Sequence, residues 1–161
     1  MAEAVTTGAA RASRILAQTR SVVVIDWPSR DVPATLAAAG FTVTVKGGPG
    51  PTDYTVWEGT DGEVVTRQLG RAPDHADLVY CHRPFGELPS IIAMAQGLGA
   101  RAVWRQSGLT SDRAKAPSGC WTPPGESQRG RELAAATGLD YIDDVYIADA
   151  VRALSGPAQP G

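Results

Sequence analysis

Two groups of polar side chains follow apolar runs of this sequence and have the chemistry to bind an anion. One group follows residues 76–81 and the other lies just beyond residues 102–104; together they comprise His82, Arg83, Pro84, Gln106, Ser107 and Gly108. Continuous apolar runs are typical of strands buried on both faces, and ligands of open parallel sheets bind beyond the carboxyl ends of the strands. We therefore expect a ligand at these residues, with Arg83 as the first contact because of its charge and Gln106 as the second.

Polar groups also follow two earlier apolar runs. Ser29 and Arg30 stand just before a predicted helix, where free amides and the helix dipole favour anions, and an arginine there can pair with phosphate. Capping of the helix is the alternative, and it is the favoured interpretation for Asp31. Lys46 ends the second run, where a basic residue suits an additional phosphate on a ribose. A solvated lysine is the alternative there.

The sequence offers little for covalent or metal chemistry. Cys81 and His82 are neighbours, and neighbouring strand residues point to opposite faces, so Cys81 is expected to be a buried apolar residue rather than a nucleophile. Asp26, Asp143 and Asp144 stand at the ends of predicted strands and could hold Mg²⁺ for phosphoryl transfer. No accompanying nucleophile is recognisable, and Asp143 and Asp144 more simply begin the last helix. A metal-dependent phosphohydrolase is therefore the least favoured function.

The elements that must position these residues alternate between strands and helices. Strands are predicted at residues 22–25, 41–45, 77–82, 101–105 and 139–143, and helices at 11–19, 32–39, 88–98, 128–137 and 145–154. Asp61-Gly62 lies between β-forming runs at residues 54–58 and 63–66, which predicts an antiparallel hairpin. This alternation predicts an α/β fold of three layers with a mostly parallel sheet.

Length and composition indicate one domain. The chain has 161 residues, 43% of them hydrophobic, and a formal net charge of −2. We expect the domain to span residues 11–154, between disordered residues 1–10 and a disordered tail at 155–161. The charge does not favour nucleic acid or an anionic membrane. Cysteine usage and the lack of a signal pattern favour the cytoplasm. The Pro- and Gly-rich connection at residues 110–129 is interpreted as a lid or a homodimer contact, with a disordered surface loop as the alternative.

Three segments of the sequence resemble the CoA-binding domain family, small Rossmann-like proteins related to the nucleotide-binding domain of succinyl-CoA synthetase. The first is Thr19-Arg20-Ser21-Val22-Val23-Val24-Ile25, and the second is Ala76-Asp77-Leu78-Val79 followed by Arg83-Pro84. The third is Gly99-Ala100-Arg101-Ala102-Val103-Trp104-Arg105-Gln106-Ser107-Gly108-Leu109, which is close to the family pattern G-A-x-x-V-W-x-Q-x-G and is the most specific of the three. The resemblance covers roughly residues 15–141.

The resemblance implies a Rossmann-like sheet of five parallel strands that binds CoA, acyl-CoA or a related adenine nucleotide, without catalysis. Together with the positions of the strand ends, it leads us to predict these ligand contacts: Trp27, Ser29, Arg30, Lys46, His82, Arg83, Pro84, Gln106, Ser107 and Gly108. The phosphate loop departs from the family pattern, because Asp26-Trp27-Pro28-Ser29 stands where the family has glycine and small polar residues. Proline removes an amide donor and Asp26 adds a negative charge. This departure leaves a second hypothesis open, a structural or interaction module that has lost its ligand.

Overall fold

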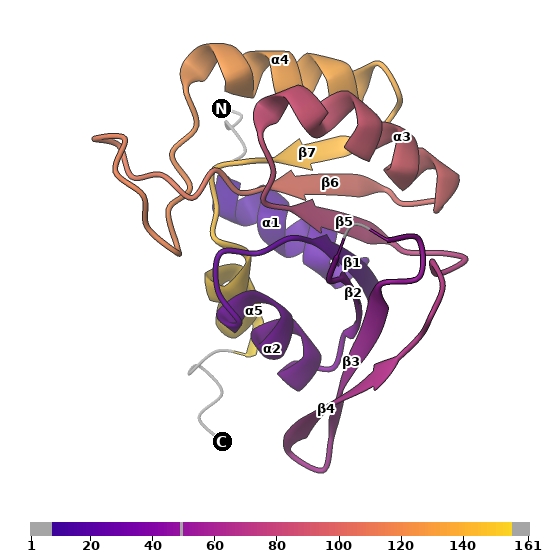
Figure 1. Cartoon of the computed structure of the whole chain (residues 1–161). Helices are drawn as coiled ribbons and strands as arrows, with labels where there is room; N and C mark the ends of the chain where they lie inside the picture. The colour runs from indigo at the N-terminus through magenta and orange to yellow at the C-terminus, as the bar shows by residue number, and fades with distance from the viewer. Residues whose placement is uncertain (1–7, 49, 156–161) are drawn as a thin grey trace.

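The computed structural model describes residues 8–48 and 50–155. Strands and helices alternate along most of this part of the chain (Figure 1). In chain order the elements are α1 (Gly8–Ala17), β1 (Ser21–Ile25), α2 (Asp31–Ala38), β2 (Thr42–Lys46), β3 (Tyr54–Thr60), β4 (Glu63–Gln68), β5 (Leu78–Cys81), the 3₁₀ turn η1 (Phe85–Glu87), α3 (Leu88–Gly97), β6 (Ala102–Arg105), α4 (Pro124–Ala135), β7 (Asp140–Ile142) and α5 (Ile147–Ser155).

The strands form one seven-stranded sheet in the order β4-β3-β2-β1-β5-β6-β7. Strands β2, β1, β5, β6 and β7 are parallel, whereas β3 pairs antiparallel with β2 and with β4. The predicted sheet of five parallel strands with an added hairpin is therefore confirmed. The order places β1 and β5 side by side at the centre, with Ile25 opposite Cys81. The polar residues that follow these two strands consequently meet at one edge of the sheet.

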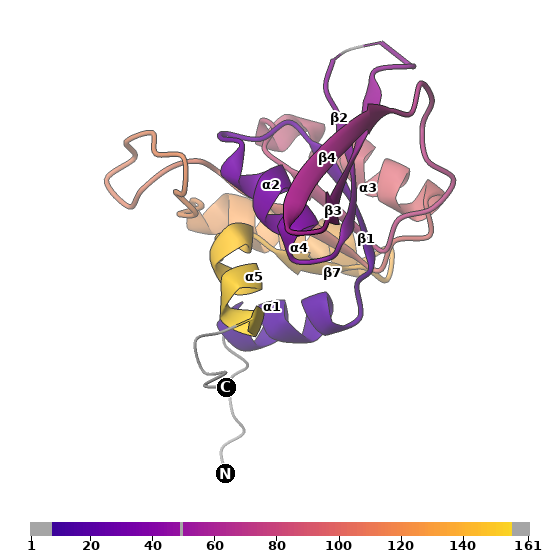
Figure 2. The same cartoon turned by 90° about the horizontal axis from the view of Figure 1, so that it is seen from below.

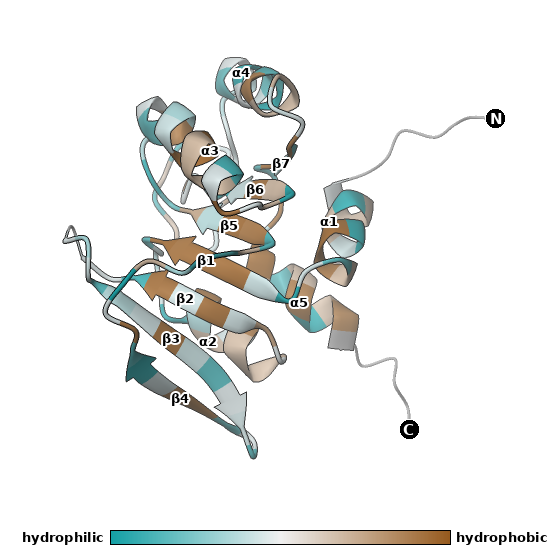
Figure 3. Cartoon of the chain, turned by 90° about the vertical axis from the view of Figure 1, so that its right-hand side faces the viewer, coloured by the Kyte–Doolittle hydropathy of each residue, from teal (hydrophilic) through white to brown (hydrophobic). Residues whose placement is uncertain are grey.

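Helices cover both faces of the sheet and make the fold three-layered. Helices α1, α2 and α5 pack on one face and α3 and α4 on the other (Figures 1 and 2). The central strands β1, β5 and β6 are mostly buried, and β1 is hydrophobic along most of its length (Figure 3), because side chains on both faces enter a core. Trp104 belongs to that core as predicted: it is 0% exposed, and its indole N–H donates to the carbonyl of Val145 over 2.9 Å. Within the described ranges, no helix combines the length and apolarity needed to cross a membrane.

The hairpin of β3 and β4 turns at Asp61 and Gly62, as the sequence predicts. Both residues have positive φ, 53° and 83°. This geometry matches the right-handed twist of the flanking strands and is the reason why Asp-Gly is favoured at two-residue hairpin turns. The hairpin extends the sheet beyond β2 and leaves β4 at the edge, where it is largely exposed.

Several predicted boundaries are corrected by the structure. Helix α1 begins at Gly8, so the disorder expected through residue 10 is wrong for Gly8–Ala10, because alanine favours helix. Helix α4 begins at Pro124 rather than at residue 128, since proline is compatible with a first helical turn. Helix α5 begins at Ile147, so Asp143 and Asp144 do not begin it. Residues 1–7 and 156–161, where disorder was also expected, lie outside the described residues.

Candidate functional site

Two cavities lie at the carboxyl ends of the parallel strands. The first has a volume of about 580 Å³ and is lined by residues from the ends of β1, β5 and β6 and from the following loop: Asp26, Pro28, His82, Arg83, Pro84, Arg105, Ser107, Gly108, Leu109, Lys115, Ala116 and Pro117. The second has a volume of about 690 Å³ and is lined by Ile25, Asp26, Trp27, Lys46, Gly47, Gly48, Arg83 and Glu87. Asp26 and Arg83 line both, so the two cavities adjoin at these residues.

Arg83 is held between two carboxylates. Its Nη1 lies 3.1 Å from Oδ2 of Asp26, and its Nε and Nη2 donate to the carboxylate of Glu87 over 3.0 and 2.7 Å. The hydrogen bonds that Arg83 donates to Glu87, followed by the one that it donates to Asp26, raise the pKa of Arg83, and Arg83 in turn lowers the pKa of Glu87. Asp26 reaches Arg83 from a left-handed backbone conformation, φ 61°, which aspartate tolerates better than most residues. The charge predicted to contact a ligand is therefore present, but it is paired within the protein.

His82 is fixed against the loop that follows β6. Its Nδ1 lies 3.0 Å from the carbonyl oxygen of Gln106, and because a carbonyl can only accept, Nδ1 carries the proton. Gly108 packs beside the same ring with φ 75°, and a Cβ at this position would lie 2.5 Å from Cε1 of His82. Gly108 is needed both for its backbone conformation and for this close approach.

The loop after β6 is an ordered wall of the first cavity. Residues 108–121 fold back on themselves: Leu109 and Lys115 form an antiparallel bridge, and the Gly108 amide donates to the carbonyl of Gly119 over 2.9 Å. The Ser107 hydroxyl donates to the carbonyl of Trp121 over 2.6 Å. In Figure 1 this loop, coloured orange, protrudes at the left, toward which the arrows of β6 and β7 also point. From the sequence, the loop is interpreted as a lid, a homodimer contact or a disordered surface loop. Its position beside the cavity agrees best with the first of these, in which the loop contacts a ligand.

The structure brings most of the predicted contacts to the cavities, but not all of them. His82, Arg83, Pro84, Ser107 and Gly108 line the first cavity, and Trp27, Lys46 and again Arg83 line the second. Gln106, the second choice from the sequence, lines neither.

Gln106 is a structural residue beneath the first cavity. It is 0% exposed, accepts a hydrogen bond from the Tyr80 hydroxyl, and donates from its amide to the carbonyls of Pro117 and Gly119 over 2.8 and 3.2 Å. An amide whose donors and acceptor all have internal partners is not free to meet a ligand. Gln106 instead holds the loop against the sheet.

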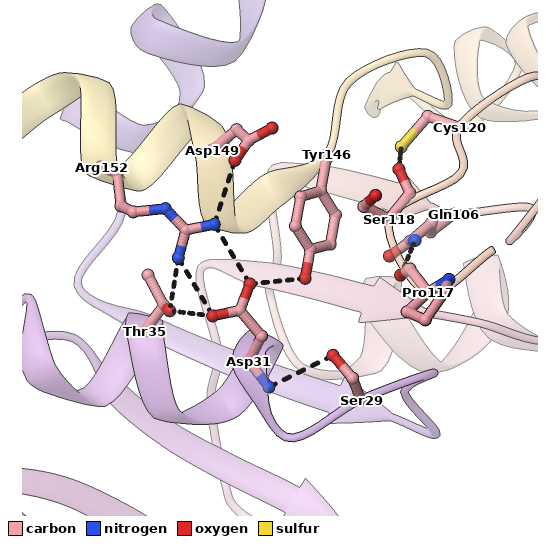
Figure 4. Close-up of polar contacts among 10 residues, drawn as sticks. All are labelled: Ser29, Asp31, Thr35, Gln106, Pro117, Ser118, Cys120, Tyr146, Asp149 and Arg152. Atoms are coloured by element: carbon pink, nitrogen blue, oxygen red, sulfur yellow. Dashed lines mark hydrogen bonds and ion pairs between the residues drawn. The ribbon is translucent and has the colours of Figure 1, made fainter.

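The residues at the start of α2 also have internal roles. The Ser29 hydroxyl accepts from the Asp31 amide over 3.3 Å, but the N-cap position of α2 is Arg30, which makes no side-chain capping hydrogen bond and lies 4.6 Å from the centre of the Trp57 ring. Neither residue lines either of the two cavities described above. Asp31 itself is not the cap: it is the first residue of α2, and its carboxylate accepts from Tyr146 and Arg152 of the C-terminal segment (Figure 4). The prediction that Asp31 caps the helix is therefore wrong.

Cys81 is buried, as predicted. It is 0% exposed, and burial raises the pKa of its thiol to about 12. A thiol in this environment is not a nucleophile at neutral pH. Asp26 is paired with Arg83, while Asp143 accepts from Ser127 on α4, so these two carboxylates have different partners. Within residues 8–48 and 50–155, no three His, Cys, Asp or Glu side chains are grouped so that they could hold a metal ion.

The sequence reasoning missed two cationic residues of the first cavity, Arg105 and Lys115. Arg105 is the last residue of an apolar strand and comes one residue before Gln106, and this position could have predicted that it lines the cavity. Lys115 could not have been found, because it reaches the cavity only when residues 108–121 fold back on themselves.

Comparisons with known proteins identify the family and the fold of this chain. Residues 21–147 match the family model described as the CoA binding domain. The crystal structure of Prb, described as the PH1109 protein redesigned for binding, superimposes with a TM-score of 0.58 at 15% sequence identity, with 100% of each chain covered. At that identity the likeness shows the fold alone. No curated protein matches. Because the family model spans most of the chain, including the ends of the central strands, this chain belongs to the CoA-binding domain family.

Proposed function

We propose that this protein binds CoA, acyl-CoA or a related adenine nucleotide across the two adjoining cavities, without catalysing a reaction. The observation that carries the proposal is that the carboxyl ends of β2, β1, β5 and β6 border two cavities of about 690 and 580 Å³ that meet at Arg83. Volumes of this size are typical of sites for small molecules and cofactors. Together the cavities offer a long ligand a continuous path along the edge of the sheet.

The orientation of the ligand is proposed from the charges at the two ends. Lys46 ends β2 and lines the second cavity beside Trp27, which supplies an aromatic ring for stacking of a base. A basic residue at the end of the second strand of such a sheet suits a phosphate on the ribose, so the nucleotide end belongs in the second cavity. The remaining part of the ligand then crosses Arg83 into the first cavity.

A non-catalytic role is proposed because the thiols beside the site are unreactive. Burial raises the pKa values of Cys81 and of Cys120 to about 12.

The alternative, a module that has lost its ligand, is favoured by one observation: Arg83 is already paired with Asp26 and Glu87. A cytoplasmic location and a homodimer remain predictions from the sequence.

Calorimetric titration of the full chain with CoA, dephospho-CoA, ADP and NAD tests the proposal. We expect CoA to bind more tightly than dephospho-CoA, and Lys46→Met to reduce this preference by on the order of tenfold, since a charge-assisted hydrogen bond is removed. Arg67→Met is the matched control, because Arg67 is an exposed cation on β4 that lines neither cavity. Folded protein that gives no heat with any of the four ligands would favour the ligand-free module.

A further inference from the structure

Arg105 is a buried cation on the wall of the first cavity. It is the last residue of β6, and its side chain is only 7% exposed. Its Nε–H donates to the carbonyl of Arg83 over 3.3 Å, and its guanidinium lies 5.4 Å from the centre of the Phe85 ring. Burying a guanidinium removes it from water, and this costs free energy unless its donors find acceptors.

The donors of Arg105 are incompletely satisfied. Its Nη1 has no hydrogen-bond partner, although it forms an ion pair with Oε1 of Glu126, which lies 3.7 Å away, beyond hydrogen-bond distance. Unsatisfied buried groups are rare in native proteins, and a bound ion or water is one of the physical explanations for them.

The charges around the first cavity favour an anion. Its lining contains the cations Arg83, Arg105 and Lys115 and one carboxylate, Asp26; because Arg83 is paired with both Asp26 and Glu87, Arg105 and Lys115 are the cations of the lining that remain for a ligand. Lys115 has no ion-pair partner in the part of the chain that the structure describes. Glu126, the carboxylate near Arg105, is on α4 with a side chain that is 40% exposed, so it can move away without loss of core packing.

We infer that Arg105 binds an anionic oxygen group of the ligand inside the first cavity, and that this group displaces Glu126 from the guanidinium. The planar guanidinium suits a carboxylate or a phosphate, which accept two parallel hydrogen bonds. The group is either a carboxylate at the end of an acyl chain or the diphosphate of the nucleotide. The assignment rests on the proposed CoA binding and extends it by naming the chemistry that the first cavity recognises.

Calorimetric titration with succinyl-CoA, propionyl-CoA and CoA, using wild type, Arg105→Met and Glu126→Gln, tests this inference. Arg101→Met is the matched control, because Arg101 is an exposed arginine that precedes the opposite end of β6. We expect Arg105→Met to weaken succinyl-CoA binding on the order of tenfold or more, because hydrogen bonds to a charged group are lost. We expect Glu126→Gln to tighten it by a few fold, since a competing carboxylate is removed.

The pattern of losses identifies the source of the anion. A loss confined to succinyl-CoA indicates an acyl carboxylate, whereas an equal loss for all three ligands indicates the diphosphate. If Arg105→Met binds all three ligands as tightly as wild type, the inference is overturned. If Arg105→Met does not fold, Glu126→Gln decides the question, and unchanged binding by that variant overturns the inference.

Failure of CoA binding is distinguishable from failure of the anion site. If wild type binds no CoA derivative, its thermal unfolding is measured with free succinate and with inorganic phosphate. A rise in melting temperature in wild type that is absent in Arg105→Met supports the anion site without CoA. No rise in wild type with either anion overturns the inference as well.

Discussion

Arg83 and Asp26 form an ion pair across the carboxyl ends of β5 and β1, with 3.1 Å between Nη1 and Oδ2, at the boundary between the two cavities. The sequence indicates that Arg83 is suited to bind a ligand and that the charge of Asp26 opposes a phosphate. It does not show that these two side chains form an ion pair. Because Glu87 also pairs with Arg83, a ligand that occupies both cavities must either release Arg83 from these carboxylates or pass a group whose net charge is negative. This relationship makes Asp26 a residue that limits affinity.

Replacing Asp26 by asparagine is expected to tighten CoA binding by a few fold. The change removes the negative charge and releases Nη1 of Arg83, while asparagine also tolerates the positive φ of 61°. The size of the effect follows from the weakness of exposed ion pairs, about 0.2–1 kcal/mol. Calorimetry measures it, with Glu58→Gln as the control, because Glu58 carries the same charge and lines neither cavity. Weaker binding by Asp26→Asn would mean that Asp26 itself contacts the ligand.

Gly108→Ala is expected to destabilise the protein more than Gly138→Ala. Both glycines have similar positive φ, 75° and 77°, so the backbone strain is shared, but only at position 108 would a Cβ lie 2.5 Å from His82. Overpacking costs about 1–3 kcal/mol. Urea unfolding measures the difference between the two variants, and equal free energies of unfolding would show that His82 moves aside without cost. Because His82 lines the first cavity, Gly108→Ala is also expected to weaken CoA binding.

The carboxylate of Asp31 is expected to make stability depend on pH. The hydrogen bonds from Arg152 are the largest cause that lowers its pKa from 3.8 to about 2, and the hydroxyls of Tyr146 and Thr35 contribute further (Figure 4). A folded-state pKa below the unfolded value stabilises the protein at pH above about 4, and this contribution is lost as the pH falls toward 2. The shift corresponds to roughly 2.5 kcal/mol. Because 39% of the side chain is exposed, solvent screening reduces the expected contribution to about 1 kcal/mol.

Urea unfolding of wild type and Asp31→Asn across this pH range tests that expectation. We expect asparagine to lower the free energy of unfolding near neutral pH and the two proteins to converge in acid. Asp149→Asn is the control, since Asp149 is the other carboxylate that Arg152 contacts, and its side chain is 70% exposed. A difference between wild type and Asp31→Asn that stays constant with pH would show that Asp31 acts through packing rather than through its charge.

Sequence reasoning succeeded where a feature depends on neighbouring residues. Val22–Ile25 predicts a buried strand because β-branched side chains fit a pleated surface on both faces, and Asp61-Gly62 predicts a turn because its backbone geometry is local. The same reasoning was wrong for Asp31. Its position near a helix start favours capping, yet its hydrogen-bond partners Tyr146 and Arg152 lie more than a hundred residues away in the chain.

By itself, the sequence determined the alternation of strands and helices and the edge of the sheet at which Arg83, His82 and Lys46 gather, because parallel strands joined by helices bring their carboxyl ends together. Only the tertiary structure decided which side chains face the cavities. Gln106 is directed inward to hold residues 117–119, while Arg105, its neighbour, lines the first cavity. The reason is physical: successive residues at the end of a strand point to opposite faces, and whether a face meets a loop, a helix or open space depends on segments far along the chain.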